Sequence, residues 1–165
     1  MYLNCLDHQE STSYIKALIL LLFLFLNSDI YNYPQPQHPV RVVRLYAIAK
    51  LLQLMIKMDE WEGFSPGTRD ALQAISFLDA SYTILIFVVS AVPNSHGPGR
   101  FMEEVEHELK EVYSLYGILN RKEPKDLNAW LLDEKHVEGE REARRIIGKL
   151  QNLGGCYRDV IASIA

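Results

Sequence analysis

The feature that most constrains this chain is a run of ten apolar residues, Ala17 to Leu26 (ALILLLFLFL). A helix built from this run is apolar on every side, so it must be surrounded by other parts of a protein or by lipid. A second run, Ile84 to Val92 (ILIFVVSAV), has nearly the same character. Because a bilayer span needs roughly 20 apolar residues, we expect two buried core helices, with membrane association as the alternative.

Neither the region around the first run nor the cysteine content indicates secretion. The residues before the run include two acids against one lysine, and no small-x-small cleavage site follows it. The two cysteines, Cys5 and Cys156, form neither a disulfide framework nor a C-x-x-C pair. We expect a cytoplasmic protein with two reduced thiols, the alternative being a bridge between these cysteines.

Charge is distributed unevenly along the chain. Residues 1–98 carry 14 charged side chains (6 basic, 8 acidic), whereas residues 99–165 carry 24 (11 basic, 13 acidic). We expect a single helical domain over residues 1–165, with an apolar interior supplied mainly by the first part and a charged outer layer by the second. The net charge of −4 gives no global attraction to nucleic acid, so such binding would need a local basic patch.

Apolar periodicity and capping residues predict an all-α fold, a bundle of five or six helices, with no strand pattern of useful length. We expect helices over residues 13–26, 40–58, 66–92 and 99–119, a short helix over 127–131, and a last helix from about residue 140. Ser65 is the expected N-cap of the third helix, Pro66 its first residue and Pro93 its end. Residues 28–39 contain three prolines and predict an extended connection.

Polar residues on the two central helices predict where these helices meet water. Lys50, Gln53 and Lys57 share a narrow strip on the second helix, which predicts one wet edge. On the third helix, Asp79 lies near Ser76 and Thr83, so we expect it at the rim of a wetter stripe rather than in a functional site.

The fourth and last helices carry apolar residues alternately three and four apart, a heptad pattern. These two seams either pair with each other or complete an oligomer, and Gly154-Gly155 either breaks the last helix or permits close packing. The residues that form a candidate interface are Met102, Val105, Leu109, Val112, Tyr116, Ile146, Leu150, Leu153 and Tyr157.

Two acid-x-x-His motifs, Glu104 with His107 and Asp133 with His136, are candidate metal ligands. A carboxylate and an imidazole three apart on a helix share a face and can bind one metal ion, and paired copies build di-iron bundles. Glu104 and His107, however, fall on the side of the helix away from its apolar seam. A solvated charged face is the simpler interpretation.

A basic row on the last helix is the candidate site for nucleic acid or another anion. Arg141, Arg145 and Lys149 are four apart, with Arg144 beside them and Arg158 further on. Such a row can follow a phosphate backbone. Glutamates are interleaved with it, so a solubilising face with intrahelical ion pairs is the alternative.

The chain contains no glycine-rich phosphate loop, nucleophile elbow or catalytically spaced Cys–His pair, so we name no catalytic residue and no cofactor. Three helices are apolar over most of their circumference, which is more than a 165-residue bundle can easily enclose. We therefore expect a non-enzymatic assembly or interaction protein, a homodimer or a subunit of a complex. The alternatives are a nucleic-acid-associated subunit and a metal-dependent enzyme.

Overall fold

The computed structural model describes residues 14–56, 76–118, 141–146 and 148, and within these residues every regular element is a helix. The predicted all-α class is therefore confirmed. The first helix, Tyr14–Asn32, includes the π-helical segment η1 (Phe25–Asp29) and the terminal turn α2 (Ile30–Asn32). It is followed by α3 (Pro39–Ile56), α5 (Phe77–Ser95) and α6 (Arg100–Ile118), and residues 141–146 are also helical.

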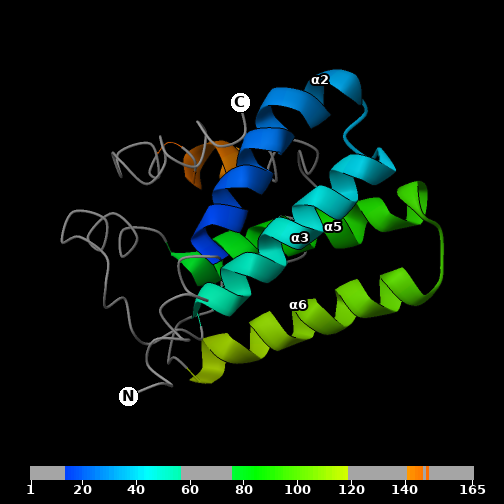
Figure 1. Cartoon of the computed structure of the whole chain (residues 1–165). Coiled ribbons are helices and arrows are strands. Elements are labelled where there is room, and N and C mark those ends of the chain that lie inside the picture. Colours follow the sequence, from blue (N-terminus) through cyan, green and yellow to red (C-terminus); the bar gives the residue numbers. More distant parts are fainter. Residues whose placement is uncertain (1–13, 57–75, 119–140, 147, 149–165) are drawn as a thin grey trace, which may run out of the picture.

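Helices α3 and α5 form the centre of the described region, and α6 packs along α5 (Figure 1). The first helix contacts α3 through η1. The close approach of the central pair is marked by Ser81 on α5, a fully buried residue whose hydroxyl donates a hydrogen bond of 3.1 Å to the carbonyl of Ala49 on α3. A serine at this point keeps the two backbones close while satisfying its own polar group.

Burial differs between the two strongly apolar helices. Both Tyr14–Asn32 and Phe77–Ser95 are long and apolar enough to span a membrane by length and composition, a test that core helices of soluble proteins also pass. In α5, 61% of the most apolar 18-residue stretch is buried, in agreement with the core helix expected around Ile84 to Val92. In the first helix only 39% is buried, so part of its apolar surface stays exposed.

The connection between the first helix and α3 is shorter than the extended segment expected over residues 28–39. That prediction was wrong over residues 28–32, which are helical, and α3 begins one residue before its expected start. The first helix continues to Asn32, and α3 begins at Pro39. Proline fits this position because the first turn of a helix does not use its N–H groups within the helix. Residues 33–38 alone make the turn.

Two arginines of α3 explain why the first helix extends so far. Asp29 is buried, and its Oδ2 accepts a hydrogen bond of 2.8 Å from Nε of Arg44. Arg41 donates from Nη1 to the carbonyls of Tyr33 and Pro34, at 3.3 and 3.1 Å. These contacts hold the helix end and the turn against α3, a tertiary effect that the proline pattern does not reveal.

The third predicted helix also differs from the structure. Ser76, expected inside a continuous helix over residues 66–92, has extended backbone (φ −77°, ψ 91°) and caps α5, its Oγ accepting from the N–H of Asp79. Ser65 and Pro66 lie outside the described residues. Pro93 does not stop the helix but lies in its last turn, which closes with hydrogen bonds from the N–H groups of residues 96 and 97 to the carbonyl of Val92.

Candidate functional site

The apolar seam of α6 packs inside the chain. Val105, Val112 and Tyr116 are almost fully buried, and Met102 and Leu109 are partly buried against the same core. The ring of Tyr116 meets that of Tyr82 on α5 edge-on, with centroids 5.4 Å apart. Of the last helix's seam, Ile146 is buried, and Leu150, Leu153 and Tyr157 lie outside the described residues. The buried α6 residues have little surface left for a second chain.

The polar strip on α3 is only partly the wet edge that was predicted. Gln53 is buried, whereas the side chain of Lys50 is 40% exposed and Lys57 lies outside the described residues. Tyr46 donates from its hydroxyl to Oε1 of Glu104 at 2.8 Å, and one turn further Lys50 donates to Oε1 of Glu108 at 2.5 Å. Three residues after Lys50 on α3, Gln53 is only 5% exposed. The carboxylates of α6 lie four residues apart, as do their partners on α3, so the two helices are joined by matching polar rows.

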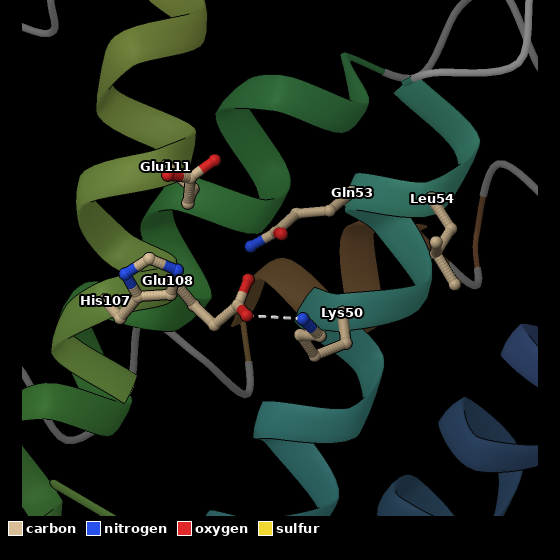
Figure 2. Close-up of a pocket in the computed structure, with 6 residues that line it drawn as sticks. All are labelled: Lys50, Gln53, Leu54, His107, Glu108 and Glu111. Carbon is tan, nitrogen blue, oxygen red and sulfur yellow. Dashed lines mark hydrogen bonds and ion pairs between the residues drawn. The ribbon is translucent and has the colours of Figure 1, made fainter. Parts of the chain in front are cut away.

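A cavity of about 240 Å³ that is open to solvent on one side lies beside these contacts, between α3 and α6 (Figure 2). Its six lining residues are Lys50, Gln53, Leu54, His107, Glu108 and Glu111. Gln53 extends from α3 toward α6, with its amide nitrogen at the α6 end (Figure 2). This buried nitrogen, Nε2, has no hydrogen-bond acceptor among the described residues.

The electrostatics of this interface favour a neutral tyrosine. Burial raises the pKa of Tyr46, and the hydrogen bond to Glu104 and the negative charges of Glu104 and Glu108 raise it further. The phenol therefore remains protonated and donates to Glu104 well into the alkaline range. The ring of Tyr46 also packs edge-on against Phe101 on α6, with centroids 5.4 Å apart.

The two residues of the acid-x-x-His motif on α6 have different neighbours. Glu104 accepts from Tyr46, so it is not simply solvated, while His107 is exposed and lines the cavity. Within residues 14–56, 76–118, 141–146 and 148, no three His, Cys, Asp or Glu side chains gather in a way that could hold a metal ion. Asp133 and His136 lie outside the described residues.

Asp79 has a structural role that agrees with the rim position expected for it. Its carboxylate is exposed and accepts from the Tyr116 hydroxyl at 2.7 Å and from the Ser76 hydroxyl at 2.5 Å. One residue thereby links the cap of α5 to the C-terminal part of α6.

Arg145, within the basic row, forms an ion pair with Glu142. Arg145 donates from Nε to Oε2 of Glu142 at 2.8 Å, and a second bond joins Nη2 to Oε1. The hydrogen bond to Glu142 raises the pKa of Arg145; burial opposes this, and the charges of Glu142 and Asp79 add to the rise. Arg141 and Arg144 are exposed and take part in interactions of their own. Lys149 and Arg158 lie outside the described residues, and nucleic-acid contact stays a prediction.

Comparisons with protein-family models, curated proteins and solved structures found no match to this chain. Function therefore has to be inferred from the chain's own surfaces, of which two stand out. One is the partly exposed apolar side of the first helix, and the other is the polar cavity between α3 and α6.

Proposed function

We propose that this chain is a non-enzymatic helical interaction protein that self-associates through the exposed side of its first helix. The observation that supports this is the low burial, 39%, of the most apolar 18-residue stretch of Tyr14–Asn32. Leu20, Phe23 and Leu24 each keep part of their surface exposed within the most hydrophobic run of the sequence. Tyr31, near the end of the same helix, is 72% exposed.

The length of the exposed apolar stretch favours a protein partner over lipid. Lys16 and Asn27 are both exposed and bound the uninterrupted run at its two ends. Ten helical residues at 1.5 Å per residue extend about 15 Å, roughly half of the ~30 Å hydrocarbon core of a bilayer. Close to the far end, Asp29 is ion-paired with Arg44, which places a charged pair where a membrane span would need apolar side chains.

A second copy of the chain is the partner that fits this surface most simply. The stretch between Lys16 and Asn27 contains no charge that would select a different, complementary partner. An uncharged apolar helix face is complementary to itself, and a two-fold dimer places one such face against its equivalent. Pairing removes the remaining exposed surface of these leucine and phenylalanine side chains from water, which is the main source of stability in such contacts.

Light scattering after size-exclusion chromatography tests the proposal. We expect the wild-type chain at micromolar concentration to have about twice the 19.0 kDa chain mass, and the double variant Leu20→Glu/Leu24→Glu to be monomeric. These side chains are one turn apart and partly exposed in the monomer, so the variant should keep its circular dichroism spectrum. Because each leucine is already partly buried, at most about a third of its 1.5–3 kcal/mol burial energy comes from the dimer contact; for the four leucines this is about 2–4 kcal/mol, so the affinity falls by roughly thirtyfold to a thousandfold.

A matched control separates this surface from others. Val43 on α3 is also apolar and 44% exposed, so Val43→Glu adds the same charge elsewhere and should leave the dimer intact. A wild-type chain that is monomeric throughout the micromolar range would contradict self-association. A dimer lost in Val43→Glu but kept in the double variant would contradict the assignment to the first helix.

A further inference from the structure

The cavity between α3 and α6 contains a buried hydrogen-bond donor without an acceptor. Gln53 is 5% exposed, and its Nε2 has no partner among the described residues. Buried polar groups in folded proteins are nearly always paired, and an unpaired one next to a cavity indicates that the cavity holds the missing partner. A molecule that pairs with this amide must present an acceptor atom, most simply an oxygen.

The charges around the cavity indicate what else that molecule carries. Lys50 and Glu108 pair with each other at 2.5 Å, which neutralises both. Glu111, an exposed residue, contributes a second carboxylate to the α6 side of the cavity (Figure 2). Counting one lysine and two glutamates, the lining has a net charge of −1 with His107 neutral. A positively charged group is the natural partner of this surplus carboxylate.

The size of the cavity limits the ligand further. Its volume of about 240 Å³ is room for several water molecules or for one small organic molecule. Pockets for drug-sized ligands are larger, at roughly 300–1,000 Å³. Leu54 contributes an apolar wall among the polar groups, against which the carbon framework of a ligand can pack.

We propose that this cavity binds a small organic cation that carries hydroxyl or carbonyl oxygens, such as an amino sugar or an amino alcohol. Its ammonium group pairs with Glu111, and one of its oxygens accepts a hydrogen bond from Nε2 of Gln53. This inference does not depend on self-association, because neither Gln53 nor Glu111 lies on the first helix.

Nuclear magnetic resonance of the full chain tests the proposal with three probes. Glucosamine carries both an ammonium group and hydroxyls, glucose lacks the ammonium group, and cyclohexylamine lacks the oxygens. We expect glucosamine to shift the side-chain amide signals of Gln53 saturably in the millimolar range, and the other two probes to bind about tenfold more weakly or less. Weaker binding of both glucose and cyclohexylamine would show that the site needs the ammonium group and an oxygen at once. Simple attraction of cations would leave cyclohexylamine binding as strong as glucosamine binding.

Two variants complete the experiment. Glu111→Gln keeps the size of the side chain and removes its charge, so we expect glucosamine binding to weaken by about tenfold or more. Glu106→Gln makes the same change at an exposed position of α6 that does not line the cavity, and should bind as the wild type does. The proposal is overturned if no probe gives a saturable shift, which means a cavity filled by water alone. Equal binding of the three probes, or equal weakening in the two variants, overturns it as well.

Discussion

The ion pair between Asp29 and Arg44 allows an asymmetric prediction about stability. The two charged atoms, Arg44 Nε and Asp29 Oδ2, are 2.8 Å apart, but the side chain of Asp29 is 5% exposed and that of Arg44 is 29% exposed. Removing the arginine leaves a buried carboxylate without its cation. Removing the aspartate charge leaves a guanidinium group that already reaches water. We therefore expect Arg44→Met to destabilise the chain more than Asp29→Asn does.

The magnitudes follow from these two environments. Loss of one partner from a buried pair costs about 3–5 kcal/mol, because an uncompensated charge stays behind. Since Arg44 is partly exposed and water can approach from its side, we expect about 3 kcal/mol for Arg44→Met, the low end of that range. Asp29→Asn keeps an amide oxygen that can accept from Nε, so only the charge assistance is lost, about 1 kcal/mol. The expected difference between the two variants is about 2 kcal/mol.

Urea unfolding of the wild type, both single variants and the double variant measures this difference. We expect the double variant Asp29→Asn/Arg44→Met to lose less free energy of unfolding than the sum of the two single variants. The reason is that the double variant contains no buried carboxylate that could be left without its cation. Arg100→Met, an exposed arginine at the start of α6, is the control and should change the free energy of unfolding by no more than about 0.5 kcal/mol. Equal costs for the two single variants, or a larger cost for Asp29→Asn, would refute the reasoning.

Three further perturbations test other parts of the fold. Because the pKa of Tyr46 is raised above its ordinary value of 10.0, the folded state keeps this proton longer than the unfolded state does. The free energy of unfolding should then fall as the pH rises above 10.0, less steeply in Tyr46→Phe, as followed by urea unfolding at several alkaline pH values. Ser81→Ala loses the buried hydrogen bond to the carbonyl of Ala49 and should lower the free energy of unfolding by about 0.5–1.5 kcal/mol. Ser81→Leu should lower it by about 1–3 kcal/mol or more, because the larger side chain overpacks the contact between α3 and α5. Thermal unfolding compares the two variants. Gly97 has φ 73° with open space around it, so Gly97→Ala should cost about 1–2 kcal/mol from backbone strain alone, again measured by thermal unfolding.

The sequence was sufficient to predict the class of fold and the buried face of α6. Val105, Val112 and Tyr116 follow the heptad spacing, and all three are nearly fully buried. This success has a simple cause, since α6 is an amphipathic helix with a charged opposite face, so its periodicity alone specifies which side packs. A helix that is apolar all round, such as the first one, gives no such information about which side remains exposed.

The start of α5 was not predictable from periodicity. The apolar spacing runs without a break through Ala71, Ile75 and Leu78, so a helix from residue 66 looks continuous. Ser76 nevertheless adopts extended backbone and caps α5, and its hydroxyl also donates to the carboxylate of Asp79. Serine competes with helical hydrogen bonding in this way, and a serine followed three residues later by a carboxylate is itself an N-terminal signal. That local signal outweighed the pattern.

The cavity between α3 and α6 could not be predicted without knowing how the residues of these two helices are aligned with each other. The Lys50–Gln53 strip and the glutamates of α6 are each visible in the sequence, and each suggests a water-facing edge when its helix is considered alone. Only the packing of both helices on α5 brings Tyr46 opposite Glu104 and Lys50 opposite Glu108. Two polar rows of matching spacing, one containing hydroxyl and amino donors and the other carboxylates, were the available signal for this pairing.

The two proposed surfaces lie on different sides of one helix. In Figure 1 the first helix and α6 lie on opposite sides of α3, which contacts the former through η1 and the latter through the Tyr46 and Lys50 side chains. Changes at Leu20 and at Glu111 therefore share no direct partner, and their effects should be independent. Glu111→Gln should leave self-association unchanged, and Leu20→Glu/Leu24→Glu should leave glucosamine binding unchanged. A change of either property by the other variant would mean that a structural shift is transmitted between the two surfaces, for which α3, in contact with η1 and α6, is the shortest route.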